Sequence, residues 1–438
     1  MMDLAKEQEL RAKIKGLVKE YYELYHQPKE YEVGERISYA GRVYDEKEML
    51  ALTDATLDFW LTNGRFTAEF EKGLAQYLGL RHANMVNSGS SANLLAFMTL
   101  TAPELGERQI RRGDEVITVA CSFPTTIAPI IQYGAVPVFV DVSLPTYNID
   151  VRYLEEALSP KTKAVILAHT LGNPFDLAAV KAFCDKHGLW LVEDNCDALG
   201  SLYNGKLTGT FGDLGTSSFY PAHHITTGEG GAVYTDNPLL HKLMLSYRDW
   251  GRDCVCSSGE DNHCGRRFSR EYEALPTGYD HKYVYSHFGY NLKATDLQAS
   301  IGVEQLKKID GFTKARQENW AKLRAGVSDL EDRLILPEKT PNSEPSFFGF
   351  ILTLRDDRRA KVIERLEAAN IQTRLLFSGN ITKHPCFNEV KAGGGYRIAS
   401  TLAVTDEILS RTFWVGVYPG MSDSKIEYMI EKIRLAVR

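Results

Sequence analysis

Two continuous apolar runs with a helix-like segment between them constrain the fold of this chain most strongly. The runs are residues 164–169 and 189–194, and the segment between them is 176–187. Strands buried on both faces read as continuous apolar runs, and their alternation with helices is typical of a mostly parallel sheet covered on both faces. Ligands of such sheets bind beyond the carboxyl ends of the strands, which is where Asp194 falls. We therefore predict an α/β fold with a site near Asp194.

A polar loop between two further strand-like runs is a second candidate for a site. The runs are residues 214–220 and 232–235, and the loop holds His223, His224 and the sequence Gly-Glu-Gly-Gly at 228–231. A loop pinned between two buried strands is where a scaffold places reactive groups. A plain hairpin with two solvated histidines remains the alternative at this point.

Residues 87–93 form a candidate phosphate loop. The sequence Asn-Ser-Gly-Ser-Ser-Ala-Asn follows a short apolar strand and opens a predicted helix over 94–100. Free N–H groups at a helix start, small hydroxyl residues such as Ser90 and Ser91, and a glycine for close approach all suit a phosphate dianion. A serine-rich helix cap without a ligand is the alternative.

The chain divides into three predicted parts. Residues 1–45 are a helical segment, because apolar residues recur near helical spacing over about residues 1–30. Residues 46–310 are the large domain, with residues 249–267 inserted in it. Residues 311–438 are a smaller α+β domain, with strands predicted at 347–354 and 372–377 and helices at 314–330, 360–369 and 424–437.

The motifs, in this order, resemble those of the sugar aminotransferases that use pyridoxal phosphate. In that family Ser-Phe, a lysine, a threonine-rich turn and Gly-Glu-Gly-Gly follow one another, as residues 218–231 do here except at the lysine. Glu-Asp at 193–194 also matches, and so does Gly-Tyr-Asn at 289–291, which is predicted to open a helix that runs on through Leu306. The resemblance covers residues from about 50 to 438. It implies an aspartate aminotransferase-like fold (fold type I), with a mostly parallel sheet in the large domain.

The resemblance also implies a role for several positions. Asp194 matches the carboxylate that keeps the pyridine nitrogen protonated, so that the ring acts as an electron sink. Phe123 matches an aromatic residue over the ring. The implied phosphate contacts are Ser90, Ser91, Ser218 and Asn291. In the family the asparagine reaches the cofactor of the neighbouring subunit, which implies a homodimer with shared sites.

Four further residues are candidate contacts to a nucleotide-sugar substrate. They are Arg65, Tyr220, His224 and Arg374. Arg65 lies in a Gly-Arg-x-Thr segment, predicted as a turn before a helix over 69–77. The segment is similar to one by the substrate entrance of the family, and a simple helix cap is its alternative. An arginine at the surface without a ligand is the alternative for Arg374.

His223 stands where the family has its lysine. No lysine occurs between Lys206 and Lys242, so a neighbour cannot easily substitute. A histidine cannot hold the cofactor covalently, but it can move protons because its pKa is near neutral. The cofactor would then be held as its amine form, pyridoxamine phosphate. This form condenses with a ketone, and proton removal by His223 expels a hydroxyl group, the 3-hydroxyl in a 4-keto hexose.

Four cysteines form a candidate metal set. They are Cys196, Cys254, Cys256 and Cys264, with the spacing C-x57-C-x1-C-x7-C. Four thiolates can hold zinc or an iron–sulfur cluster, although structural zinc sites use pairs two to four residues apart. Coincidence is the alternative, because Cys121, Cys184 and Cys386 show that the chain tolerates isolated cysteines.

The histidine and the cysteine spacing together resemble the cluster-bearing branch of sugar-nucleotide 3-dehydratases. This branch carries a [2Fe–2S] cluster on four such cysteines. The resemblance implies CDP-4-keto-6-deoxy-D-glucose as the substrate and a flavin and iron–sulfur, NADH-dependent reductase as the partner that supplies two electrons. A related branch shares the histidine, lacks the cluster and takes its amine from glutamate. A catalytically silent, redox-sensing homologue is a rival from another class.

Composition excludes other classes of function. Lys plus Arg is 51 and Asp plus Glu is 57, so the formal net charge is −6, which argues against a nucleic-acid-binding protein. No window approaches the roughly 18 apolar residues that a membrane span needs, and the N-terminal residues do not resemble a signal peptide. We therefore expect a cytoplasmic enzyme with no nucleic-acid or membrane partner.

Overall fold

The computed structural model describes residues 4–438 and contains an eight-stranded sheet at its centre. The strand order is β1-β9-β8-β5-β4-β2-β3-β14. Neighbouring strands from β8 to β14 are parallel, whereas β9 runs antiparallel to both β1 and β8. The strands are β1 (His82–Val86), β2 (Glu115–Val119), β3 (Val136–Val140), β4 (Thr162–Ala168), β5 (Trp190–Asp194), β8 (Leu214–Ser218), β9 (Gly231–Thr235) and β14 (Arg397–Ile398).

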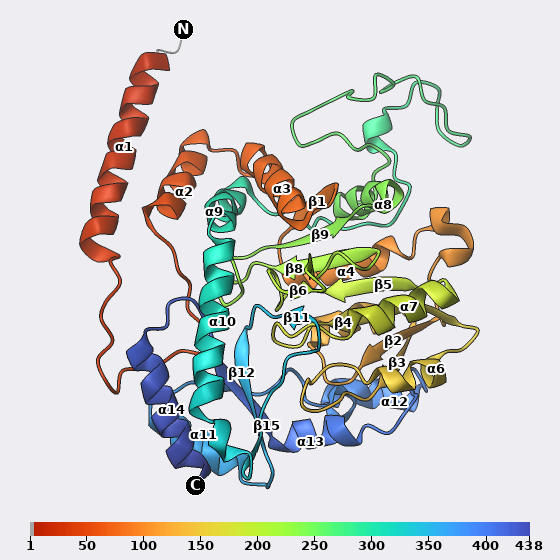
Figure 1. Ribbon diagram of the computed structural model, residues 1–438. Coiled ribbons are helices and arrows are strands. Elements are labelled where there is room, and N and C mark those ends of the chain that lie inside the picture. Colours follow the sequence, from red (N-terminus) through yellow and green to blue (C-terminus); the bar gives the residue numbers. More distant parts are fainter. Residues whose placement is uncertain (1–3) are drawn as a thin grey trace.

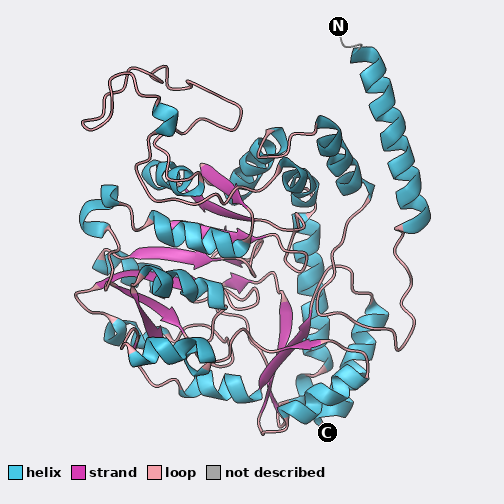
Figure 2. Cartoon of the chain, turned by 180° about the vertical axis from the view of Figure 1, so that it is seen from behind, coloured by secondary structure: helices cyan, strands magenta, loops and turns pink. Residues whose placement is uncertain are grey.

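Helices cover both faces of this sheet (Figures 1 and 2). Each face has its own apolar core, one containing Val165 and Leu191 and the other Ala164 and Val192. This alternation along β4 and β5 explains why both strands read as continuous apolar runs. The helices of this part are α2 (Glu46–Asp58), α3 (Arg65–Leu78), α4 (Gly89–Thr99), α5 (Pro124–Tyr133), α6 (Leu154–Ala157), α7 (Leu177–His187), α8 (Pro238–Arg248) and α9 (Asp296–Leu306).

The C-terminal part is built on a second, antiparallel sheet of order β10-β12-β15-β13. Its core packs β12 and β15 against α10, α11 and α14. The strands are β10 (Leu334–Ile335), β12 (Gly349–Leu354), β13 (Thr373–Arg374) and β15 (Thr412–Gly416). The helices are α10 (Ile309–Gly326), α11 (Arg359–Ala368), α12 (Asn388–Ala392), α13 (Ala403–Arg411) and α14 (Asp423–Val437). A three-stranded sheet, β11 (Ser343–Glu344), β6 (Leu202–Tyr203) and β7 (Lys206–Leu207), joins the two parts.

These elements confirm the predicted α/β fold and refine it in three places. Helix α9 begins at Asp296 rather than at residue 289, because Thr295 caps it with a capping box. Helix α3 begins at Arg65, so Arg65 lies in the helix and not in a preceding turn. Strand β14 comes from the C-terminal part of the chain, yet it pairs with β3 at the edge of the large sheet.

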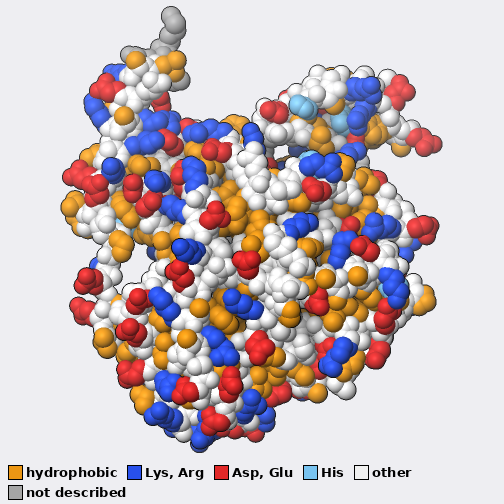
Figure 3. All heavy atoms as spheres, viewed as in Figure 1, with side chains coloured by type: hydrophobic (Ala, Val, Ile, Leu, Met, Phe, Trp, Pro, Cys, Tyr) orange, Lys and Arg blue, Asp and Glu red, His pale blue; other side chains and the backbone are white. Residues whose placement is uncertain are grey.

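Two segments stand out from the body. Helix α1 (Leu4–Tyr25) lies at the outer edge of the molecule beside α2, and the segment between α8 and α9 projects as an extended loop above α8 (Figure 1). Charged side chains of both signs are interspersed over the face seen in Figure 3, in keeping with the small net charge of −6. Among the described residues, no helix is both long enough and apolar enough to cross a membrane.

Candidate active site

A cavity of about 450 Å³ lies beyond the carboxyl ends of β5 and β8, where the large sheet meets the C-terminal part. Loops from several strands and the start of α4 form its walls, as expected for a parallel sheet. It brings together residues that are far apart in the sequence. The predicted site residues that line it are Ser90, Phe123, Asp194, Cys196, Ser218, Tyr220, His223 and Arg374.

One end of the cavity is the N-terminus of α4. Ser88 caps this helix, because its Oγ accepts the N–H of Ser91 at 3.0 Å. The hydroxyl of Ser90 faces the cavity and donates to Thr125 Oγ1 at 3.2 Å. A Cβ on Gly89 would lie 2.4 Å from the Cβ of Ser218, so only glycine lets the two loops approach this closely. The free N–H groups and hydroxyls at this end suit a phosphate group.

Asp194 forms the floor, held by three hydrogen bonds. Its Oδ2 accepts from Asn93 Nδ2 at 2.8 Å and from Thr126 Oγ1 at 2.7 Å, and its Oδ1 accepts the N–H of Cys196 at 3.2 Å. The amide of Asn93 is oriented in turn by Thr216, whose hydroxyl donates to Asn93 Oδ1 at 2.7 Å. The carboxylate is therefore fixed in direction at the end of β5, as a ring-nitrogen partner would need to be.

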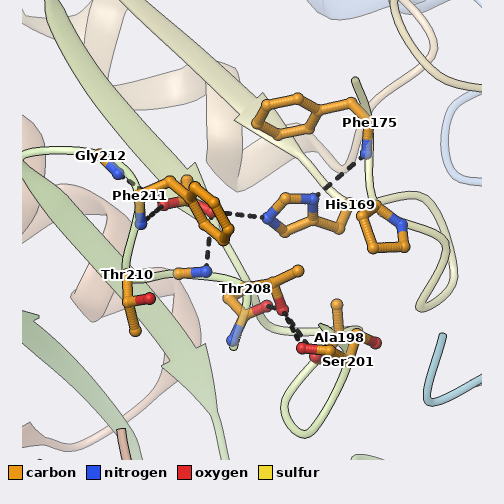
Figure 4. Close-up of polar contacts among 12 residues, drawn as sticks. His169, Phe175, Ala198, Ser201, Thr208, Thr210, Phe211 and Gly212 are labelled. Carbon is orange, nitrogen blue, oxygen red and sulfur yellow. Dashed lines mark hydrogen bonds and ion pairs between the residues drawn. The ribbon is translucent and has the colours of Figure 1, made fainter. Parts of the chain in front are cut away.

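Glu193, the neighbour of Asp194 on β5, is fully buried behind the cavity. Its carboxylate accepts the N–H groups of Gly209, Phe211 and Gly212, each at 2.7 Å, and lies 3.1 Å from His169 Nε2. Figure 4 shows His169 and the 208–212 loop around this point, with the N–H of Phe175 directed at the other ring nitrogen. Since that nitrogen accepts, Nε2 carries the proton and donates to Glu193. This pair anchors β5, and with it Asp194.

His223 reaches the cavity from the loop between β8 and β9. Its Nδ1 is buried without a hydrogen-bond partner among the described residues, and lies 3.4 Å from Asp197 Oδ1. Burial lowers the pKa of His223 to about 4, although the charge of Asp194 opposes this shift. The imidazole is therefore neutral near pH 7 and can accept a proton. Among the described residues that line the cavity there is no lysine.

Arg316 on α10 holds the His223 loop from beneath. Its guanidinium donates to the carbonyl oxygens of His223 at 3.1 Å, Phe347 at 3.2 Å and Val417 at 2.6 Å. Burial lowers the pKa of Arg316 to about 9, which still leaves it cationic at neutral pH. One buried side chain thus ties the position of His223 to the C-terminal part.

His224 points away from the cavity. Its Nε2 lies 2.7 Å from the carbonyl oxygen of Ser346, and the side chain is buried. Burial lowers the pKa of His224 well below its ordinary value, so the ring is neutral and donates to this carbonyl. The two histidines are therefore not solvated in a plain hairpin, although β8 and β9 do pair antiparallel.

Three more of the predicted site residues lie outside the cavity in this chain. The hydroxyl of Ser91 bonds to Ser88 Oγ at 3.0 Å within the helix cap. Asn291 Oδ1 accepts from Lys293 Nζ at 2.6 Å at the surface. Arg65 pairs with Asp58 at 2.7 Å and lines a separate hollow of about 790 Å³ beside α3 and α8.

The four cysteines do not converge. Cys196 lies in the cavity next to Asp194, and burial raises its pKa well above the ordinary value. Cys254, Cys256 and Cys264 lie on the projecting loop, where the thiol of Cys254 interacts electrostatically with the other two. Within residues 4–438, no group of three or more His, Cys, Asp or Glu side chains is arranged to hold a metal ion. The conformation of this chain therefore does not fit an iron–sulfur cluster on these four residues.

Sequence reasoning missed several residues that shape the site. Asp197 carried a signal, since it completes the polar run Glu-Asp-Asn-Cys-Asp at 193–197. Asn93 lies one helical turn after Ser90, on the side of α4 that faces the cavity. Arg316 carried no signal in the sequence, because an arginine in a charged helix is expected to be exposed. Four aromatic residues that line the cavity also carried no signal in the sequence. They are Tyr39, Phe348, Phe377 and Trp414.

Comparison with known proteins agrees with this geometry. The model of the DegT/DnrJ/EryC1/StrS aminotransferase family matches residues 43–434. The chain belongs to this family. Its fold is that of the aspartate aminotransferase-like enzymes of fold type I, as the motifs indicated.

Relatives of this family member span nearly its full length. The lipopolysaccharide biosynthesis protein RfbH of Salmonella typhimurium is 50% identical over 427 residues, 97% of each chain. The dTDP-4-dehydro-2,6-dideoxy-D-glucose 3-dehydratase of Saccharopolyspora spinosa is 54% identical over 90% of this chain and 85% of its own. Among solved structures, E. coli GDP-4-keto-6-deoxy-D-mannose-3-dehydratase with bound hydrated PLP has a TM-score of 0.80 at 28% identity, covering 91% of this chain and all of its own.

Proposed function

We propose that this family member is a pyridoxamine-phosphate-dependent C-3 dehydratase of a nucleotide-linked 4-keto-6-deoxyhexose. The observation that carries the proposal is His223, which takes the lysine position in a cavity that holds the fixed carboxylate Asp194 and, among the described residues, is lined by no lysine. Two of the relatives described above are named as 3-dehydratases of such sugars, which supports the same reaction.

The cavity residues fit the cofactor. Pyridoxamine phosphate supplies an amine that condenses with the C4 ketone and a ring that accepts electrons. Ser90, Ser218 and the N-terminus of α4 would bind the phosphate, with Ser91 supporting the cap. Asp194 would pair with the ring nitrogen, and the half-exposed side chain of Phe123 would cover a face of the ring. Asn291 is proposed to complete the phosphate site of the partner in a homodimer, since it lies outside the cavity of its own chain.

His223 is proposed as the base. A neutral imidazole held in the cavity would take up the proton of the exocyclic carbon of the cofactor, and could return this proton to the departing 3-hydroxyl, which would leave as water. A histidine cannot replace the covalent hold of a lysine, so amino transfer is not the net outcome. Tyr220 and Arg374 line the same cavity and are candidates for contacts to the sugar nucleotide, whereas His224 and Arg65 point elsewhere in this chain.

We further propose CDP-4-keto-6-deoxy-D-glucose as the substrate, in the biosynthesis of a 3,6-dideoxyhexose for lipopolysaccharide. The nucleotide rests on the resemblance of the cysteine and histidine pattern, because the related dehydratases are named for dTDP and GDP sugars. The relative RfbH is named as a lipopolysaccharide biosynthesis protein. We propose a cytoplasmic location, in keeping with such a nucleotide-sugar pathway.

An iron–sulfur cluster and a reductase complete the proposal. Conversion of the dehydrated sugar to the 3-deoxy product needs two electrons and two protons, which dehydration does not supply. We propose a [2Fe–2S] cluster on Cys196, Cys254, Cys256 and Cys264, and a flavin and iron–sulfur, NADH-dependent reductase as the donor. The projecting loop would have to move toward Cys196 for the four thiolates to meet.

A second candidate is a cluster-free dehydratase that takes its amine from glutamate. The separation of Cys196 from the other three cysteines favours it. The experiment incubates the protein and pyridoxamine phosphate with CDP-, dTDP- and GDP-linked 4-keto-6-deoxyhexoses. One arm receives NADH and a reductase, and the other receives glutamate. We expect a 3,6-dideoxy sugar from the CDP substrate in the reductase arm only. Turnover with glutamate alone would favour the second candidate, and failure to lose the 3-hydroxyl from any substrate would favour a silent homologue.

A further inference from the structure

Helix α1 packs on the body through a side that carries Arg11, Lys15 and the buried Tyr22. Arg11 Nη1 lies 3.3 Å from Asp54 Oδ1 and 3.1 Å from Asp58 Oδ1, and Lys15 Nζ lies 2.8 Å from Asp54 Oδ2, all on α2. An amphipathic helix normally buries its apolar stripe and leaves its charges in water. In α1 the ion pairs and Tyr22 face the body, while most of the apolar side chains stay exposed.

Another side of α1, about a third of a turn round the helix from Arg11 and Lys15, carries an exposed apolar seam. We use this name for Leu10, Ile14, Leu17, Tyr21 and Leu24, whose side chains are between 38% and 67% exposed. Their spacing of four, three, four and three residues is that of the seam between two paired helices. The helix stands at the outer edge of the molecule in both views (Figures 1 and 2), and it precedes the family match, which begins at residue 43.

We propose that the seam packs antiparallel against α1 of a second copy of this chain. The charged residues beside the seam indicate that its partner is a second α1 helix. Lys13 and Glu20 flank it on one side, one heptad apart. In an antiparallel pair, this flank of one helix lies beside the same flank of the other helix. Lys13 of each copy therefore faces Glu20 of the other. In a parallel pair Lys13 would face Val18, and Glu20 would face Tyr25.

The charges also select the register. With Leu10 opposite Tyr21 and Ile14 opposite Leu17, both Lys13–Glu20 pairs form. Shifting one helix by a heptad would bring the two Glu20 side chains together instead, which is unfavourable. Two heptads are too few to join two chains by themselves. The pairing therefore rests on the homodimer proposed above and adds to it, because dimerisation raises the local concentration of one α1 near the other.

A disulfide trap tests the pairing. Leu10→Cys/Tyr21→Cys places two thiols about 16 Å apart within one helix, too far for an internal bond. Across the proposed pair they meet, so we expect a covalent dimer on a non-reducing gel after mild oxidation. The matched control is Ala12→Cys/Lys19→Cys. These two positions are centred on the same point along the helix as positions 10 and 21, but they lie on the side away from the seam. This variant should stay uncross-linked.

The orientation and the charges have their own controls. Leu10→Cys alone should not cross-link, and efficient cross-linking of this variant would mean a parallel pair and overturn the proposal. In the double-cysteine background, Lys13→Glu or Glu20→Lys should slow disulfide formation by about two- to fivefold, and the two together should restore it. A monomeric parent chain in light scattering would overturn both the homodimer and the pairing. A dimeric parent whose double-cysteine variant stays uncross-linked would overturn the pairing only.

Discussion

The Nδ1 atom of His223 lies 3.4 Å from Oδ1 of Asp197, at the point where β5 ends and the loop after β8 crosses it. Burial lowers the pKa of His223 to about 4 and raises the pKa of Asp197 to about 8. The imidazole at the lysine position is thus uncharged near neutral pH, with a carboxyl group beside one nitrogen. The cavity offers a base at this position, and the part of the chain that the structure describes lines it with no amine for a covalent bond to a cofactor.

His223→Lys should restore the covalent hold and remove the proton transfer of the native side chain. We expect pyridoxal phosphate to give a visible absorption band with this variant, and dehydration to fall by at least about 10²-fold. Absorption spectra and turnover of the 4-keto sugar measure the two effects. His224→Gln is the matched control, since His224 faces away from the cavity and its change should leave the spectrum unaltered. Dehydration at the parental rate by His223→Lys would show that His223 is not the base.

Thr126→Val should lower the rate of dehydration by roughly tenfold without changing the fold. The change keeps the shape of the side chain but removes the 2.7 Å hydrogen bond to Asp194, and a bond to a charged group contributes about 1.5–3 kcal/mol. Thr118→Val is the control, because the hydroxyl of Thr118 is buried without a hydrogen-bond partner among the described residues. Steady-state kinetics of both variants test this, and equal rates would mean that Asp194 needs no such orientation.

Glu193→Ala should destabilise the protein by about 3–5 kcal/mol, because it leaves three backbone N–H groups and His169 without their acceptor in a dry interior. Glu193→Gln keeps one acceptor oxygen and should lose less. Urea unfolding followed by circular dichroism compares the two. An alanine variant as stable as the parent would mean that water replaces the carboxylate.

Stability should fall as the pH drops from about 7 toward 4, partly because of His241. This ring stacks on His82 with centroids 4.0 Å apart, and burial lowers its pKa to about 4. The unfolded chain takes up a proton near the ordinary pKa of 6.5, whereas the folded state does not, so acid favours unfolding between these values. His241→Gln removes this proton uptake. We expect its free energy of unfolding to depend less steeply on pH over this range than that of the parent.

Protein purified without oxygen should contain iron and sulfide near two per chain and be brown, if the proposed [2Fe–2S] cluster forms. Cys264→Ser should lose both elements, whereas Cys386→Ser, at an exposed cysteine outside the set, should retain them. Metal analysis and electron paramagnetic resonance of the reduced protein measure the outcome. Stoichiometric zinc without a visible band would leave a structural metal and no electron relay.

Much of the fold could be predicted because its strands and helices follow from apolar patterns in short stretches of sequence. The runs at 164–169 and 189–194 became β4 and β5, and the segment at 176–187 became α7, with bounds within two residues. The helix predicted from residue 289 begins only at Asp296, because the Gly-Tyr-Asn motif at 289–291 lies before the capping box at Thr295. Strand β14 was not predicted, because two residues carry no periodicity and pair only where β3 offers an edge.

The sequence by itself determined the chemistry of the site: a histidine in place of lysine, a strand-end carboxylate and a serine-rich helix start. These follow from residue types at short spacing, which a linear chain displays directly. Only the tertiary structure decided which of these groups meet. It brought His223 and Asp194 into one cavity, turned His224 away, kept Cys196 apart from the cysteines of the projecting loop, and laid Arg11 and Lys15 of α1 against α2. Such contacts join residues up to hundreds of positions apart, and they depend on packing that no local pattern encodes.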